Sequence, residues 1–101
     1  MMLLTKEILA KLPPIKGQEV KGEDAVAFVK FFTPDSNWTW YATEYDPAEG
    51  LFFGLVQGFE EELGYFSLAE LKVARRGPMG LAIERDKWYS PKPIKELRRA
   101  A

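Results

Sequence analysis

Carboxylates and aromatic rings are the side chains of this sequence that could do chemistry, and they gather in its middle. The segment 31–71 carries eight Asp or Glu residues, no Lys or Arg, and 11 of the 14 aromatic residues. His and Cys are absent from the chain, which removes the Ser-His-Asp triad, a thiolate nucleophile and the common zinc ligands. Catalysis would have to use carboxylates, Lys, Tyr or a cation held by oxygen atoms. We therefore expect a protein that is not an enzyme and needs no cofactor.

Two groups of carboxylates resemble catalytic or metal-binding sets. The acids at Glu60–Glu62 could supply the carboxylate pair of a glycoside hydrolase, but a domain this small offers no evident cleft, and an exposed acidic turn is the simpler interpretation. Asp35, Glu44, Asp46 and Glu49 could supply oxygen ligands to Ca²⁺ or Mg²⁺, although their spacing matches no known loop such as the EF-hand. The sequence therefore predicts neither catalytic residues nor a metal site.

The turn and strand from Pro34 to Tyr45 contain the residues that we predict to bind a partner. The simpler interpretation is a hairpin that sets the strand register and supplies core tryptophans. The functional interpretation is a recognition loop beside tyrosines that stand exposed on the sheet, because aromatic residues often anchor protein–protein contacts. The predicted partner-binding residues are Asp35, Asn37, Tyr41, Glu44 and Tyr45.

The C-terminal part of the chain is basic. Residues 72–101 contain nine Lys or Arg and three carboxylates, although the whole chain has a net charge of −1. This segment either lies against the acidic middle or contacts the phosphates of a nucleic acid, with an aromatic ring stacking on a base. No helix-turn-helix, RNA-recognition or zinc-finger pattern accompanies it. The nucleic-acid-binding alternative rests on Lys87, Trp88, Lys92, Lys95, Arg98 and Arg99.

Turn residues and hydrophobic periodicity divide the chain into short elements. Capping patterns predict one helix that follows Thr5 and another that follows Ser67. The predicted strands are 25–33, 38–45, 51–58 and a short 64–66; the predicted helices are 5–12, 67–76 and a basic 93–101. The segment 15–24 is predicted to be a loop, 79–85 a brief extended piece, and 87–93 an irregular docked segment.

Alternation along the second strand predicts its two faces. Trp38, Trp40 and Ala42 should face one way, and Thr39, Tyr41, Thr43 and Tyr45 the other. We expect Trp38, Trp40 and Phe53 to form the core, and Gly54 to mark a bulge or a point of close packing.

These elements predict one α+β domain over residues 1–101, in which a three- to four-stranded antiparallel meander sheet packs against short N- and C-terminal helices. The basic tail 92–101 is expected to fray, and an edge strand would allow a homodimer. No apolar run reaches the roughly 20 residues of a membrane span, and the charged N-terminus does not resemble a signal peptide. We expect a cytoplasmic protein.

Three stretches, FFTPDSNWTWYATEYDP, LFFGLVQGFEEELGYFSLAEL and RGPMGLAIERD, resemble the small bacterial domain-of-unknown-function family numbered twenty-nine fifty-eight. The resemblance runs from about Leu3 to Pro93. It implies a stand-alone protein of plasmids, phages and other mobile elements, and it implies no activity, cofactor or catalytic residue. The tail after Pro93 is more basic than the family pattern. We therefore expect a non-enzymatic accessory protein that binds another protein through an acidic, aromatic sheet face, with nucleic-acid binding as the alternative.

Overall fold

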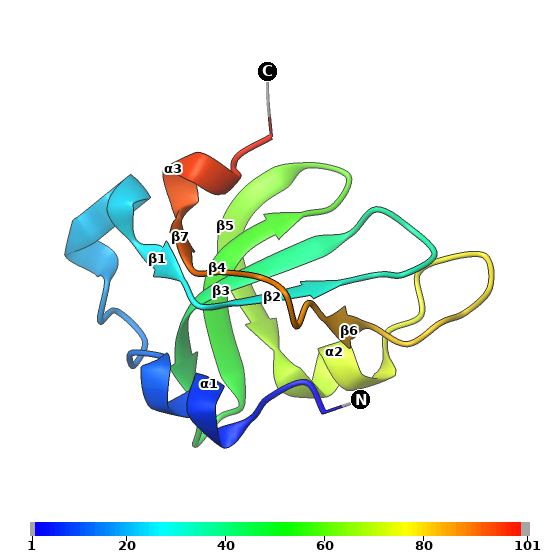
Figure 1. The fold of residues 1–101 in the computed structure, drawn as a ribbon, viewed down its shortest axis with the longest axis horizontal. Coiled ribbons are helices and arrows are strands. Elements are labelled where there is room, and N and C mark those ends of the chain that lie inside the picture. Colours follow the sequence, from blue (N-terminus) through cyan, green and yellow to red (C-terminus); the bar gives the residue numbers. More distant parts are fainter. Residues whose placement is uncertain (1, 100–101) are drawn as a thin grey trace.

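A five-stranded antiparallel sheet forms the centre of the computed structural model, which describes residues 2–99 (Figure 1). The strand order is β5-β4-β3-β2-β6, and a separate two-stranded sheet pairs β1 with β7. The strands are β1 Val26–Ala27, β2 Val29–Phe32, β3 Thr39–Asp46, β4 Leu51–Gln57, β5 Glu61–Ser67, β6 Glu84–Arg85 and β7 Lys92–Pro93. The helices are α1 Lys6–Lys11, the 3-10 helix η1 Glu19–Asp24, α2 Leu68–Val73 and α3 Ile94–Leu97.

The α+β class and the antiparallel sheet are confirmed, but the sheet has one strand more than the three or four predicted. The predicted strand 25–33 is split into β1 and β2, and the late segment β6 adds a strand beside β2. Strands of two residues are too short to leave a period in the sequence. The strand predicted at 64–66 begins three residues earlier, so Glu61 and Glu62 lie within β5. For these two residues the predicted acidic turn is wrong.

Two predicted helix caps are confirmed. Thr5 Oγ1 accepts a hydrogen bond from the N–H of Ile8 at 3.2 Å, and Ser67 Oγ accepts one from the N–H of Glu70 at 3.0 Å. Such bonds satisfy donors that have no partner inside the helix. The second helix ends at Val73 and is therefore shorter than predicted.

The segments on either side of the smaller sheet are also more ordered than the sequence suggests. The predicted loop 15–24 contains η1, and the tail contains β7 and α3. The N–H of Ile94 donates to the carbonyl of Ala25 at 2.9 Å, and the Gln57 side chain donates to the carbonyl of Leu97 at 2.7 Å. These bonds attach the tail to both sheets. Residues 100 and 101, part of the predicted basic helix, lie outside the described residues.

A β-bulge in β3 changes which side chains share a face. Ala42 pairs with Gly54 and Glu44 with Phe53, so Thr43 is one extra residue on β3. Beyond the bulge the alternation is reversed. Tyr45 therefore points to the same side as Trp40, and the prediction that it shares a face with Tyr41 is wrong.

Gly54 sits opposite this bulge. A Cβ at this position would lie 1.8 Å from the carbonyl oxygen of Tyr41. Only glycine allows the two backbones to approach so closely. The predicted point of close packing is thus confirmed.

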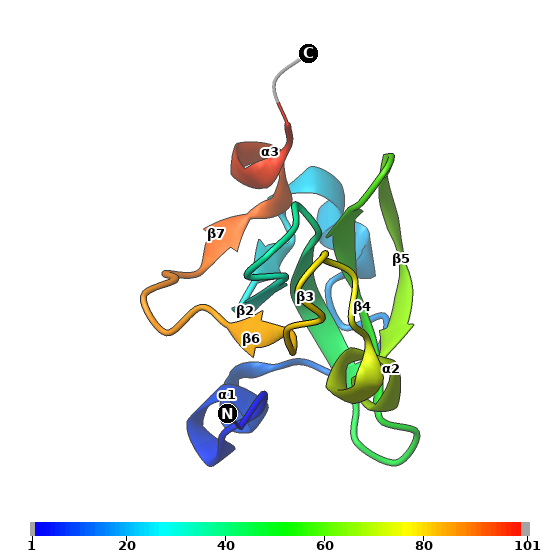
Figure 2. The ribbon, with the colours of Figure 1, turned by 90° about the vertical axis from the view of Figure 1, so that its right-hand side faces the viewer.

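Two hydrophobic cores lie on opposite faces of the sheet. Figure 2 shows the curvature of the strands that separate them. The larger core is covered by α2 and the segment around α1, and its buried side chains include Leu3, Val29, Phe31, Trp40, Tyr45, Phe52, Phe66, Leu71 and Ile83. The smaller core lies between the other face and the β1–β7–α3 unit, and consists of Ala25, Ala27, Tyr41, Leu55 and Ile94. Of the predicted core stripe, Trp40 is buried and Trp38 packs against the larger core. Phe53 lies on the opposite face, where β4 and β5 extend beyond the smaller core.

Candidate functional site

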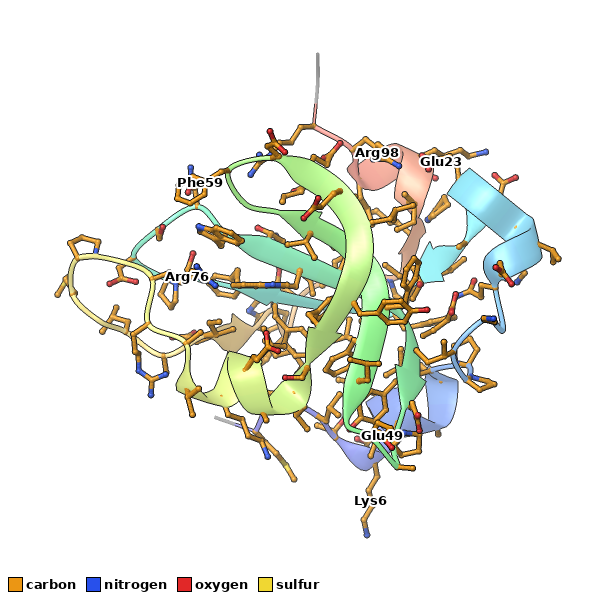
Figure 3. The ribbon with its side chains drawn as sticks, turned by 180° about the vertical axis from the view of Figure 1, so that it is seen from behind. Lys6, Glu23, Glu49, Phe59, Arg76 and Arg98 are labelled. Carbon is orange, nitrogen blue, oxygen red and sulfur yellow. The ribbon has the colours of Figure 1, made fainter. Side chains whose placement is uncertain are left out.

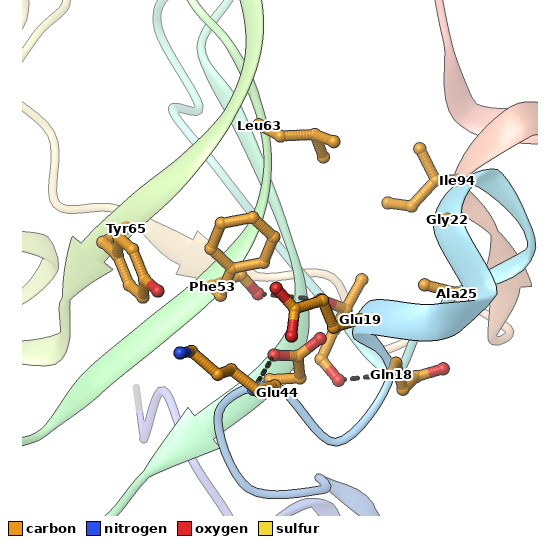
Figure 4. Close-up of a pocket in the computed structure, with 11 residues that line it drawn as sticks. Gln18, Glu19, Gly22, Ala25, Glu44, Phe53, Leu63, Tyr65 and Ile94 are labelled. Carbon is orange, nitrogen blue, oxygen red and sulfur yellow. Dashed lines mark hydrogen bonds between the residues drawn. The ribbon is translucent and has the colours of Figure 1, made fainter.

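An open groove of about 220 Å³ lies between η1 and the exposed face of β4 and β5 (Figure 4). The β1–β7–α3 unit covers Tyr41 of β3 and Leu55 of β4 on this face, whereas Leu63 and Tyr65 of β5 remain exposed. The groove is lined by Lys16, Gln18, Glu19, Gly22, Ala25, Thr43, Glu44, Phe53, Leu63, Tyr65 and Ile94.

One wall of the groove is apolar and accessible. The Phe53 and Tyr65 rings meet edge to face, with centroids 5.0 Å apart. Leu63 is 43% exposed and Tyr65 is 56% exposed. Large apolar side chains that remain this accessible beside a cavity are typical of contact surfaces.

A carboxylate lies at the floor of the groove. Glu44 is only 4% exposed, and its Oε1 accepts a hydrogen bond from the N–H of Lys16 at 2.5 Å. The bulge at Thr43 turns Glu44 to this side of the sheet. Lys16 adopts the left-handed region with φ of 72°, an uncommon conformation for a residue with a side chain. The chain thus bends sharply where it supplies the donor.

Gln18 attaches the opposite wall to the sheet. Its side-chain amide donates to the carbonyls of Val26 and Thr43 at 2.8 and 2.7 Å, and its Oε1 accepts from the N–H of Val26 at 2.7 Å. The side chain is 3% exposed, so these bonds satisfy a polar group that is buried. Sequence reasoning missed Gln18, because one glutamine in a charged segment carries no distinguishing signal.

The groove combines a carboxylate with apolar walls. The buried carboxylate of Glu44 stands beside aromatic and aliphatic walls, and Glu19 adds a second carboxylate to the lining. Such a site can accept a side chain with an apolar stem and a cationic end. Among residues 2–99, no group of three or more Asp or Glu is arranged to hold a metal ion.

Two of the predicted partner-binding residues are not on a surface. Tyr41 is 9% exposed and packs against Tyr89, with ring centroids 5.8 Å apart. Tyr45 is 7% exposed and packs on Phe52 at 4.5 Å. Burial raises the pKa of both tyrosines, Tyr41 and Tyr45. The predicted exposed tyrosine face is therefore wrong, because the smaller core covers one ring and the bulge turns the other into the larger core.

The other three predicted partner-binding residues lie in different places. Asp35 Oδ2 accepts from the N–H of Met79 at 2.9 Å, and so holds the segment that leads towards β6. Asn37 is exposed in the β2–β3 turn. Glu44 lines the groove.

The basic residues of the nucleic-acid alternative are divided. Lys95 pairs with Asp24 at 2.7 Å, and Arg98 pairs with Glu23 at 2.7 Å and with Glu61 at 3.5 Å. The hydrogen bond from Arg98 lowers the pKa of Glu23. These contacts support the interpretation that the tail lies against carboxylates.

The remaining members of that set differ in how they are held. Arg99 donates from its backbone N–H to Glu61 at 2.8 Å and from its side chain to the Gly58 carbonyl at 2.9 Å. Lys87 and Lys92 are exposed, and Trp88 is 92% exposed.

A second accessible aromatic cluster lies on the other side of the molecule. The Arg76 guanidinium sits 4.3 Å from the centre of the Trp38 ring, and Phe59 packs edge to face on the same ring. Figure 3 shows Phe59 and Arg76 on one side, and Arg98 beside Glu23 on the other. The Trp38 ring also packs over Gly58, where a Cβ would lie 2.2 Å from the ring.

The fold is that of a small α+β protein with an open groove on one face of its sheet. The chain belongs to the family described as protein of unknown function (DUF2958), whose model matches residues 3–101. No curated protein and no solved structure matches the chain. In the part of the chain described, no helix is long and apolar enough to cross a membrane.

Proposed function

We propose that this chain is a non-enzymatic binding protein whose groove accepts a Lys or Arg side chain of another protein. The aliphatic stem would lie along Phe53, Leu63 and Ile94, and the cation would approach Glu44. The family resemblance supports a role as an accessory protein of mobile DNA, acting in the cytoplasm.

The observation that carries the proposal is the position of Glu44. A carboxylate that is buried beside apolar walls has lost most of its water, so a cation that reaches it replaces missing hydration. The charges of the groove favour a cation, since Glu19 and Glu44 outnumber Lys16. Tyr65 and Phe53 add ring faces that attract a cation.

A titration of isotope-labelled protein with n-butylguanidinium tests the proposal directly. The expected result is saturable shifts of the amide resonances of Glu44, Phe53, Leu63 and Tyr65, with n-butanol as the neutral control of equal length. Glu44→Gln keeps an oxygen that can accept from Lys16 but removes the charge, and it should abolish saturation. Equal shifts with both probes, or an unchanged response of Glu44→Gln, would overturn the cation-binding role.

Capture of partners from a host lysate then asks whether the groove binds a protein. Tyr65→Ser should lose whatever the unmodified chain captures. Trp88→Ser removes an equally accessible aromatic residue outside the groove and should retain it. Equal capture by both variants would argue against the groove.

The nucleic-acid alternative has less support. Carboxylates pair with Lys95 and Arg98, and this lowers the positive potential that a phosphate would meet. A mobility shift at low salt that disappears when residues 92–101 are deleted would restore this alternative.

A further inference from the structure

Among residues 2–99, no strand lies beside the outer edge of β5, so this edge presents a row of backbone groups. β5 is the last strand of the sheet on one side, and it is seven residues long. Its pairing with β4 runs without a bulge, and it contains neither Pro nor Lys. Edge strands are normally shortened, bulged or charged with Lys, because a bare edge pairs with other strands.

The hydrogen bonds at its two ends show which residues face outward. The N–H of Gly58 donates to the carbonyl of Glu60, and the N–H of Leu68 donates to the carbonyl of Gly50. Residues directly opposite in an antiparallel pair alternate between bonded and non-bonded. Even-numbered residues of β5 therefore bond to β4. The residues whose N–H and C=O groups point outward are Glu61, Leu63, Tyr65 and Ser67.

We propose that a second copy of this chain pairs with β5, antiparallel, about a two-fold axis through Gly64. Gly64 is the midpoint of Glu61–Ser67, so this register alone pairs all seven residues of both strands. Leu63 then lies opposite Tyr65 of the second copy, and Glu61 lies opposite Ser67 of the second copy. Both are pairs of outward-facing residues, as hydrogen bonding across the edge requires.

The side chains and charges of β5 fit this register. Leu63 and Tyr65 are each about half exposed. In the dimer, Leu63 of each copy would pack against Tyr65 of the other copy, so the same apolar contact forms on both sides of the axis. Glu62 lies opposite Phe66 of the second copy, so no carboxylate faces another carboxylate. At the axis, even a Cβ on Gly64 would meet no atom of its own chain within 4 Å.

The pairing also has a consequence for the groove. A two-fold axis perpendicular to the sheet places the same face of both copies on the same side. The apolar walls formed by Leu63 and Tyr65 would then join two grooves into one strip. The pairing does not depend on the groove's ligand, and it can fail or hold independently of the proposed function.

Cysteine cross-linking tests the pairing and its register. In this register Gly64 lies opposite Gly64 of the second copy in a non-bonded pair, where the two Cα atoms are about 4.5 Å apart. This distance falls within the roughly 4.4–6.8 Å between the Cα atoms of disulfide-bonded cysteines. Because the chain has no Cys, Gly64→Cys should form a covalent dimer on oxidation with diamide. Glu62→Cys, two residues away on the same strand, is the matched control and should remain largely monomeric.

Sedimentation of the unmodified protein provides an independent measurement. We expect a dimer that Leu63→Lys converts to a monomer, since this charge would face Tyr65 of the second copy. A monomer at every concentration, together with no excess cross-linking of Gly64→Cys over Glu62→Cys, would overturn the pairing. A dimer that cross-links more readily through Glu62→Cys would overturn the register.

Discussion

The two edges of the five-stranded sheet are built differently. β6 is two residues long and is followed at once by a hydrogen bond from the N–H of Asp86 to the Lys30 carbonyl. The Arg85 side chain there donates to the carbonyl of Met2, which brings the N-terminal segment against this edge. β5 offers seven unbroken residues with accessible Leu63 and Tyr65. One edge is therefore short and packed against other segments, whereas the other is a long strand at the end of the sheet.

Phe52→Ala should lower the free energy of unfolding the most, because the Phe52 ring packs on β5 and also on β2, the strand that pairs with β6. Its ring contacts Phe66 in β5 at 5.2 Å and Phe31 in β2 at 5.4 Å, and it is fully buried. Loss of a buried phenylalanine costs about 3–5 kcal/mol of unfolding free energy. Urea denaturation measures this loss of unfolding free energy. Phe59→Ala, which removes a 92% exposed ring, is the control and should change stability by less than about 0.5 kcal/mol. Similar losses for the two variants would contradict the assigned core.

Asp35→Ala should lower the local stability of the segment that leads into β6 and leave that of β5 unchanged. The carboxylate accepts from Met79 and Leu81, and the segment that follows leads into β6. Both hydrogen bonds are exposed to water, so their loss should cost about 0.5–1.5 kcal/mol of unfolding free energy. Hydrogen exchange should accelerate at residues 79–85 and remain the same at 61–67. Faster exchange in β5 as well would show that the two edges are not independent.

Glu61→Gln should have the smallest effect and should depend on pH. Burial of Glu61 acts to raise its pKa, but hydrogen bonds from Arg99, Gln57 and Arg98 prevail and lower the pKa below its ordinary 4.5. A lowered pKa gives stability that is present above pH 4.5 and is lost as pH falls through the folded-state value. The variant should lose less than about 1 kcal/mol at neutral pH. Its urea midpoint should approach that of the unmodified protein as pH falls below 4.5. A constant difference at all pH values would rule out an ionised Glu61 as the cause.

Local rules predicted the parts of this fold that depend on nearby residues. The caps at Thr5 and Ser67 and the hairpin turns follow from side chains that bond their own backbone neighbours. The alternation of β3 was predicted correctly as far as Ala42. It failed beyond Thr43, because a single inserted residue reverses the faces without changing the type of any residue. Gly54 was the only local sign of the bulge.

The groove could not be predicted, because its walls come from segments distant in the sequence. Lys16 and Gln18 meet β3 only after the chain folds, and Tyr65 reaches the same space from β5. Glu44 was predicted as a partner-binding residue because of its charge beside the tyrosines. Its position at the floor of the groove depends on the bulge at Thr43, which the sequence does not reveal. The pairing of Arg98 with Glu23 likewise joins residues 75 positions apart. Long-range contacts of this kind leave no periodic signal.

Arg98 links the two walls of the groove. Its guanidinium pairs with Glu23 in η1 and with Glu61 on β5, and so ties the two walls together at one end. Both pairs are partly exposed, and at 2.7 and 3.5 Å they lie well within the Debye length of about 8 Å at physiological ionic strength, so added salt weakens them only in part. Arg98→Ala would remove both contacts and release η1 from β5 at this end of the groove.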